Sequence, residues 1–93
     1  MNENSNIFIN KKILVYGLGK TGLSTFSFLK NKNEVFIFDD FKKNISNPSI
    51  RKKFITFKKT ISFGFDLIIL SPGIDINNCK LSSLLKKNLE IIY

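Results

Sequence analysis

Cysteine and long hydrophobic runs are both scarce in this chain, and each shortage argues against a class of protein. One cysteine, Cys79, cannot form an internal disulfide, which argues against a disulfide-stabilised secreted domain and suits a reducing compartment. No apolar run approaches the roughly 20 residues that cross a membrane. The start of the chain lacks the positive charge and long apolar stretch of a signal peptide. We therefore expect a cytoplasmic protein with no membrane partner.

Acidic residues are also few, because seven Asp and Glu stand against 15 Lys and Arg, for a formal net charge of +8. The lysines come in short pairs spread along the whole chain among Asn, Ile and Phe. Since no aromatic stacking motif accompanies them, we interpret the charge as a solvated basic surface and predict no nucleic-acid partner. A basic interaction or nucleic-acid-binding domain is the alternative, and its affinity would fall steeply with salt.

Apolar runs alternate with segments of helical periodicity, and no linker or repeat divides the chain. A length of 93 residues allows one small domain, which we place at residues 11–93 after a polar tail at residues 1–10. Strands are predicted at 13–16, 35–38, 54–57, 66–70 and 89–93. Helices are predicted at 21–30, after Asn47-Pro48, and around 81–85 with Asn77 or Asn78 as its cap. This alternation predicts an α/β fold: a Rossmann-like open parallel sheet of about five strands, order 3-2-1-4-5, with helices on both faces.

A glycine-rich motif follows the first predicted strand, and it admits two readings. Gly19-Lys20-Thr21 could end an ATP-binding P-loop, but that motif needs a glycine where Leu14 stands, inside the strand. The sequence Gly17-Leu18-Gly19-Lys20-Thr21-Gly22 instead fits Gly-x-Gly-x-x-Gly. In that motif the first glycine ends the strand, the second lets the backbone approach an anion and the third permits close helix packing.

The motif predicts a site for a nucleotide diphosphate at the start of the helix. Backbone N–H groups near Lys20, Thr21 and Gly22 would point at the anion, where the helix dipole favours negative charge. Lys20 could add a charge and Thr21 a hydroxyl donor, while Asp39, at the tip of the second strand, suits hydrogen bonds from a ribose or base. The simpler alternative is that the glycines only make a tight turn between strand and helix.

Topology predicts that three loops meet at the carboxyl edge of the sheet, around the point where ligands bind in open α/β folds. They are the glycine motif, the acidic loop that begins with Asp39-Asp40, and the loop Ser71-Pro72-Gly73. Proline disfavours a helical Ser71, and Gly73 can take the positive φ of a type II turn, so the chain should turn sharply there.

Together, the glycine motif, the acid after the second strand, Ser71-Pro72-Gly73-Ile74 and Leu89-Glu90-Ile91-Ile92 resemble the N-terminal domain of the D-glutamate-adding Mur ligases, over about residues 12–93. The resemblance implies a cytoplasmic role in peptidoglycan synthesis, and through it in cell shape and division, with UDP-N-acetylmuramoyl-L-alanine as the bound substrate. It implies that the helix start receives the pyrophosphate, that Asp39 and Asp40 face the uracil, and that Ser71 with Gly73 lines the sugar-phosphate side. Leu18 and Pro72 would complete that UDP site.

The same resemblance implies that this chain carries no catalytic residue, metal or cofactor of its own. ATP and magnesium belong to the family's central ATPase domain, and that domain and a C-terminal domain are the implied partners. We therefore expect no ligase activity from the 93-residue chain alone. We also expect the last strand, with no crossover helix after it, to leave an exposed apolar part of the sheet that favours aggregation or pairing with the missing half.

One departure from the family concerns Asp40, where a hydroxyl residue is frequent. A carboxylate cannot donate to a uracil carbonyl, although the backbone N–H of Asp40 could. Because successive strand side chains point to opposite faces, we expect only one of the two aspartates to meet the base, and we predict Asp39. The alternative for Asp40 is a solvated acid at the strand end.

Two other nucleotide-related readings stay open. A nicotinamide-binding module of a dehydrogenase or transport regulator would use the glycine motif and Asp39 equally well, but it gives Ser71-Pro72-Gly73 no obvious role. The L-alanine-adding Mur ligases are the other relative, although their glycine loop usually has more glycines and their fourth strand ends differently.

Overall fold

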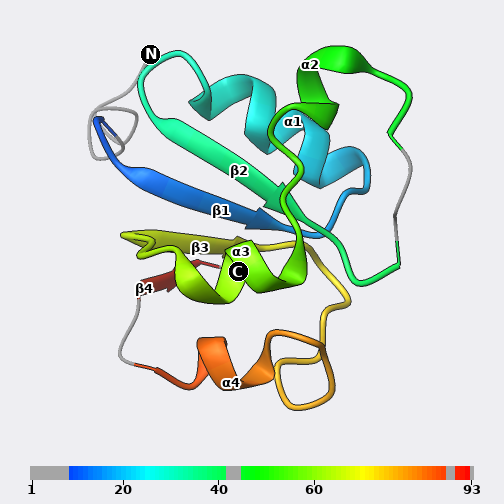
Figure 1. The fold of residues 1–93 in the computed structure, drawn as a ribbon, viewed down its shortest axis with the longest axis vertical. Helices are drawn as coiled ribbons and strands as arrows, with labels where there is room; N and C mark the ends of the chain where they lie inside the picture. Colours follow the sequence, from blue (N-terminus) through cyan, green and yellow to red (C-terminus); the bar gives the residue numbers. More distant parts are fainter. Residues whose placement is uncertain (1–8, 42–44, 88–89, 93) are drawn as a thin grey trace.

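The computed structural model describes residues 9–41, 45–87 and 90–92, which form a parallel sheet between two layers of helices (Figure 1). The strands are β1 (Lys12–Tyr16), β2 (Glu34–Phe38), β3 (Leu67–Leu70) and β4 (Glu90–Ile92). The helices are α1 (Lys20–Leu29), α2 (Pro48–Arg51), α3 (Phe57–Ser62) and α4 (Ser82–Leu85). None of these helices is long and apolar enough to span a bilayer, within the part of the chain that is described.

The sheet is open and entirely parallel, with the order β2-β1-β3-β4. The strands predicted at 13–16, 35–38 and 66–70 are confirmed within a residue or so. The predicted final strand is confirmed at Glu90–Ile92, while Leu89 and Tyr93 lie outside the described residues. Apart from the predicted third strand, the predicted order of neighbours is therefore correct.

The predicted strand at 54–57 is wrong, so the described residues form four strands rather than about five. Phe54 makes only an isolated parallel bridge to Ile37 at the outer edge of β2. The chain then turns into α3, because the Thr56 hydroxyl oxygen accepts a hydrogen bond from the Lys59 N–H at 3.2 Å and caps the helix. The β-branched and aromatic residues of this segment favour a strand, but Thr56 caps a helix here.

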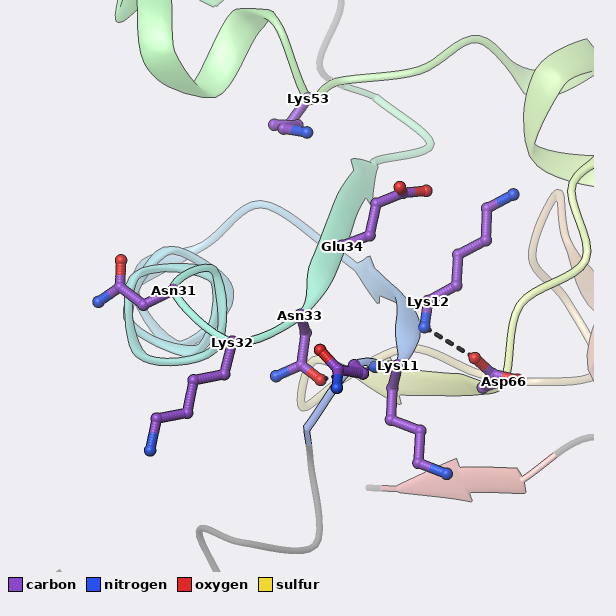
Figure 2. A pocket seen from close by; sticks show the side chains of 9 residues that line it. Lys11, Lys12, Asn31, Lys32, Asn33, Glu34, Lys53 and Asp66 are labelled. Atoms are coloured by element: carbon purple, nitrogen blue, oxygen red, sulfur yellow. Dashed lines mark hydrogen bonds between the residues drawn. The ribbon is translucent and has the colours of Figure 1, made fainter.

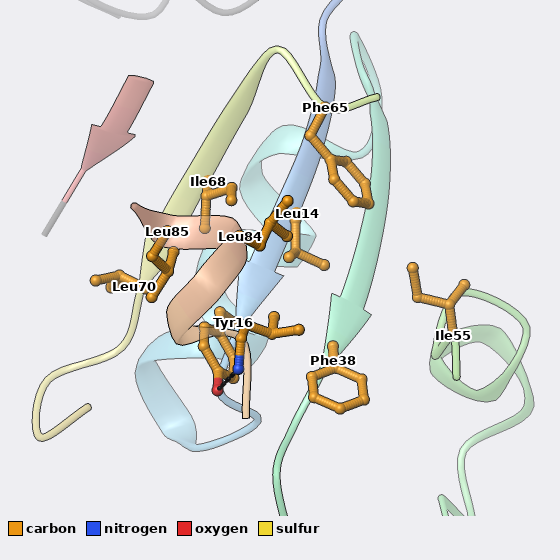
Figure 3. Close-up of a cluster of buried hydrophobic side chains, with 10 residues drawn as sticks. Leu14, Tyr16, Phe38, Ile55, Phe65, Ile68, Leu70, Leu84 and Leu85 are labelled. Carbon is orange, nitrogen blue, oxygen red and sulfur yellow. Dashed lines mark hydrogen bonds between the residues drawn. The ribbon is translucent and has the colours of Figure 1, made fainter. Parts of the chain in front are cut away.

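Helices cover both faces, as predicted, because alternate strand residues face opposite sides of the sheet. Ile13 and Val15 pack with α1 and α2 on one face, and Leu14 and Tyr16 pack with α4 on the other (Figure 3). The second face also receives α3 through contact of the Phe57 and Phe38 rings, whose centroids lie 6.2 Å apart. Both cores are continuous with the strand tips that carry the candidate site.

The helix start predicted at Asn47-Pro48 is confirmed by α2, but the predicted cap of the last helix is not confirmed. Asn47 caps α2 by accepting hydrogen bonds from the N–H groups of Ser49 and Ile50. The predicted capping of the last helix by Asn77 or Asn78 is wrong, since α4 begins only at Ser82 and no side chain caps it. Both asparagines instead donate to the Asp75 carboxylate, which fixes a separate turn before the helix. Of the predicted polar tail at 1–10, residues 1–8 lie outside the described part.

Candidate functional site

Gly17 ends β1 in a conformation that only glycine adopts without strain. Its φ is +107°, and a Cβ atom there would lie 2.6 Å from the Ser71 hydroxyl oxygen. The Gly17 N–H donates to the Phe38 carbonyl at the end of β2, at 2.8 Å. The first glycine of the motif therefore sits in the narrow space between two strand ends, as the sequence predicted.

Gly22 brings the first turn of α1 against the end of β1. A Cβ atom at Gly22 would lie 2.1 Å from the Gly17 carbonyl oxygen, closer than any two such atoms can approach. The third glycine of the motif thus permits the close packing of helix on strand that the sequence predicted.

The N-terminus of α1 opens toward solvent without a side-chain cap. Gly19 is the N-cap residue, no side chain bonds to the first turn, and no acidic residue lies in that turn. A Cβ atom at Gly19 would meet no atom within 4 Å, so the backbone there is open to an approaching group. Lys20 and Thr21 are both exposed at this end. The first N–H groups of the helix therefore remain available for an anion, which the helix dipole favours.

The tip of β2 is tied to the glycine loop by Asp39. Its Oδ2 accepts a hydrogen bond from the Leu18 N–H at 2.6 Å, and its Oδ1 accepts one from the Phe41 N–H at 2.9 Å. Asp39 therefore sets the position of the loop as well as facing the same edge.

The tip of β3 holds the other side of the loop through Ser71. Its N–H donates to the Tyr16 carbonyl and its hydroxyl donates to the Gly17 carbonyl, each at 3.0 Å. Gly73 has a φ of +92° and the Ile74 N–H donates back to Ser71, so the predicted sharp turn is confirmed, with Pro72 exposed on it. The three predicted loops are thus brought together at one edge of the sheet.

Asp40 points to the other side of the strand tip, as the alternation predicted, but it is not a solvated strand-end acid. Its Oδ1 accepts a hydrogen bond from the Tyr16 hydroxyl at 2.6 Å, and its Oδ2 accepts one from the Lys80 N–H at 3.2 Å. The Lys80 ammonium donates to the Asp40 carbonyl oxygen at 2.8 Å. Asp40 thereby joins β2 to the segment before α4.

The buried Tyr16 hydroxyl lies at the centre of this second network. It donates to Asp40 and accepts a hydrogen bond from the Leu81 N–H at 3.3 Å. Burial, with the Asp40 carboxylate beside it, raises the pKa of the Tyr16 phenol well above its usual value. The protonated phenol is therefore the form that the folded protein stabilises.

Tyr16→Phe should lower the free energy of unfolding by about 1–3 kcal/mol at neutral pH, because it leaves a buried N–H and a carboxylate oxygen without a partner. The folded-state pKa of the phenol lies above the unfolded-state value of 10.0, so its contribution is complete below about pH 10 and declines above it. Chemical denaturation of both proteins between pH 7 and about pH 11 checks this, since lysine titration is common to both. A stability difference that stays constant over that range would contradict it.

Two hollows differ in their relation to this edge. One of about 270 Å³ lies beside the β2 tip, where Asp39, Asp40 and Lys80 are among its lining residues. A larger one of about 670 Å³ lies at the opposite, amino-terminal edge of the sheet, around Lys12 and Asp66. The Lys11 and Lys32 side chains point away from each other (Figure 2), while the ammonium groups of Lys12 and Lys53 lie over the rings of Phe63 and Phe36, 4.3 and 5.1 Å from the centroids. The four lysines of this hollow therefore do not converge on one common point. No cluster of His, Cys, Asp and Glu that could hold a metal occurs within residues 9–41, 45–87 and 90–92.

Sequence reasoning missed four residues around the candidate site: Tyr16, Phe54, Phe57 and Lys80. The role of Tyr16 could have been predicted, because a phenol at the end of a buried strand needs a hydrogen-bond partner there. The role of Lys80 could not have been predicted, since it is one lysine among many and reaches Asp40 only through the tertiary fold.

Comparison with known proteins gives one family and a consistent set of relatives. The domain family described as "Mur ligase MurD-like, N-terminal domain" matches residues 11–93. Proteins named UDP-N-acetylmuramoylalanine--D-glutamate ligase are similar to this chain. The one from Rickettsia prowazekii is 34% identical over 76 residues, covering 78% of this chain and 17% of the relative. The one from Buchnera aphidicola subsp. Baizongia pistaciae is 33% identical over 95 residues, covering 91% and 21%.

A more distant relative of the same name agrees with these. The protein from Streptococcus gordonii is 29% identical over 99 residues, covering 97% of this chain and 22% of the relative. The chain thus spans about a fifth of the length of the curated relatives it matches.

Proposed function

Because the chain belongs to the MurD-like N-terminal domain family of the Mur ligases, we propose that it binds the UDP part of UDP-N-acetylmuramoyl-L-alanine at the carboxyl edge of its sheet. The whole protein to which such a domain belongs would add D-glutamate to that substrate, using ATP and magnesium in other domains. The chain would thus serve peptidoglycan synthesis as a substrate-binding part of a ligase.

The observation that carries the proposal is the open N-terminus of α1, held between two strand tips. The N-cap Gly19 leaves the first-turn N–H groups without a side-chain cap, and exposed Lys20 adds positive charge. Backbone N–H groups and a helix dipole at one point make a site for a diphosphate. Ser71 and Asp39 hold this geometry from either side by hydrogen bonds to Gly17 and Leu18.

We assign the remaining parts of UDP to the surface beside this cradle. Asp39 lies between the glycine loop and the 270 Å³ hollow at the β2 tip, so a ribose beside it would direct the base into that hollow. Ser71 and Gly73 border the loop on the side where the sugar-phosphate would continue. The bond from the Ser71 hydroxyl to the Gly17 carbonyl holds the glycine loop in place whichever nucleotide binds, so the titration below is what separates UDP from NAD.

We further propose that the 93-residue chain alone has no ligase activity. Its glycine motif is of the dinucleotide type, and the sequence contains no Gly-x-x-x-x-Gly-Lys-[Ser/Thr] motif to hold the triphosphate of ATP. ATP-dependent coupling of D-glutamate by the purified chain would overturn this part of the proposal.

Isothermal titration calorimetry of the chain with UDP-N-acetylmuramoyl-L-alanine, UDP, NAD and ATP tests the binding role. We expect both uridine nucleotides to bind at least about tenfold more tightly than NAD or ATP, a difference of about 1.4 kcal/mol. Preference for NAD would favour the nicotinamide-binding alternative. Indifference to all four, together with salt-sensitive binding to DNA or RNA, would favour the basic-domain alternative.

A further inference from the structure

The hollow at the β2 tip combines flat apolar walls with one cationic edge. Its apolar lining includes Phe54 and Phe57, whose rings contact Phe38 with centroids 6.4 and 6.2 Å away. Phe57 remains 43% exposed, so part of its ring faces solvent and can contact a ligand. Aromatic surfaces of this kind accept the π-face of any base and do not distinguish one base from another. Discrimination must come from the polar groups at the edge.

The two aspartates of the hollow are already engaged by donors of the protein. Asp39 accepts hydrogen bonds from two backbone N–H groups, and Asp40 accepts them from Tyr16 and from the Lys80 N–H. Neither carboxylate can donate to a base carbonyl, whatever else it accepts. A donor for such a carbonyl must therefore be a backbone N–H, such as that of Asp40, or another side chain in the lining.

Lys80 offers the one cationic donor among the described residues that line the hollow. Its ammonium carries three N–H bonds, and the structure assigns one of them to the Asp40 carbonyl at 2.8 Å. This bond fixes the ammonium at the edge of the hollow, although the rest of the residue is exposed. The remaining N–H bonds have no protein partner among the described residues. Thr56 is the other side chain in the lining with a donor, but its hydroxyl is neutral and caps α3.

On the premise that this edge takes UDP, we propose that Lys80 is the specificity-determining residue that recognises the keto oxygen at position 4 of the uracil base. That oxygen accepts a charge-assisted hydrogen bond from an ammonium, whereas the oxygen at position 2 is common to uracil and cytosine and cannot distinguish them. Cytosine presents an amino donor at position 4, which an ammonium repels. In this chain Lys80 thus performs the donation that the Asp40 carboxylate cannot make.

The test is calorimetric titration of the intact 93-residue chain and its variants with UDP and with CDP. The wild type should prefer UDP by about tenfold, and Lys80→Met should weaken UDP binding by about the same factor and abolish the preference. Lys86→Met is the matched control: it removes the same charge from an exposed lysine outside the hollow and should leave both affinities unchanged. Lys80→Gln is a milder second variant if thermal melting shows that Lys80→Met is unfolded, and it should reduce the preference in the same direction.

The outcomes separate this inference from the proposed function. If the wild type binds UDP but does not discriminate against CDP, or if the Lys80 variants keep the wild-type preference, the role of Lys80 is overturned while UDP binding stands. If the wild type binds neither nucleotide, the UDP-binding function itself fails, and the role of Lys80 fails with it.

Discussion

Gly22→Ala should lower the free energy of unfolding by about 3 kcal/mol, at the upper end of the usual cost of overpacking. The new Cβ atom would lie 2.1 Å from the Gly17 carbonyl oxygen, a backbone atom that cannot rotate away as a side chain could. Alanine in a helix gains up to about 1 kcal/mol over glycine, so the propensity term opposes the clash but does not cancel it. Urea denaturation of the two proteins, followed by circular dichroism, measures the difference.

Gly64→Ala is the matched control for this substitution. Gly64 has no positive φ, and a Cβ atom there would meet nothing within 4 Å. Alanine should therefore be neutral or stabilise the protein by less than about 1 kcal/mol, through the unfolded chain. If Gly22→Ala and Gly64→Ala had the same effect on stability, α1 could not pack as closely on β1 as described, and the shape of the anion site would be different.

The cost at Gly22 also bears on function, because relieving the clash would move the start of α1 away from β1. The first-turn N–H groups would then shift relative to the loop that Ser71 and Asp39 hold in place. A small displacement at a preorganised site lowers affinity even where the protein remains folded. We therefore expect the folded fraction of Gly22→Ala to bind UDP more weakly than the wild type.

The sheet and the meeting of three loops could be predicted from sequence because their signals are local and strong. Four-residue apolar runs that end in glycine, aspartate or serine mark parallel strands buried on both faces, and chain order with right-handed crossovers then fixes which tips are neighbours. The glycine spacing could be interpreted in the same way. The positive φ at Gly17 and the close helix packing at Gly22 both arise within one strand-turn-helix unit.

The segment around Phe54 could not be predicted in this way, because two local preferences compete there. Phe54 and Ile55 favour a strand, and Ile37 of β2 does bond the residues on either side of Phe54. The Ile37 N–H donates to the Lys53 carbonyl, and the Ile37 carbonyl accepts from the Ile55 N–H. Thr56 favours a helix cap, and the residues after it are helical. Single-sequence patterns do not say which of two adjacent signals prevails, since that depends on packing against Phe38 from a distant strand.

The second network was out of reach for a different reason. Tyr16, Asp40 and Lys80 are separated by 24 and 40 residues, and nothing in their spacing marks them as partners. Their contact depends on where the segment before α4 lies over the sheet. Side-chain partners of this kind follow from tertiary structure, and for Asp40 they replace the solvated position that was the alternative expectation.

Asp39→Asn should lower the free energy of unfolding by about 2 kcal/mol, because it weakens two charge-assisted hydrogen bonds, one from Leu18 that joins the glycine loop to the β2 tip and one from Phe41 within the loop after β2. The amide has the same shape as the carboxylate but only one acceptor oxygen, so its NH2 group must face the N–H of Leu18 or of Phe41. Amide hydrogen exchange by NMR should show Leu18 losing protection beyond the global loss of stability. Chemical denaturation of both proteins measures the global loss of stability.

Asp75→Asn is the matched control, since it removes the same charge from a carboxylate that accepts a hydrogen bond from a backbone N–H in an exposed turn. It should change stability by less than about 1 kcal/mol and leave the exchange of Leu18 unaltered.

The two variants also separate charge from geometry at the proposed UDP site. Both reduce the negative charge of the chain by one, which would favour a diphosphate slightly, but only Asp39→Asn loosens the loop. Weaker UDP binding by Asp39→Asn alone would show that loop position outweighs the charge; equal or tighter binding by both would mean that the carboxylate of Asp39 is not needed to hold the loop.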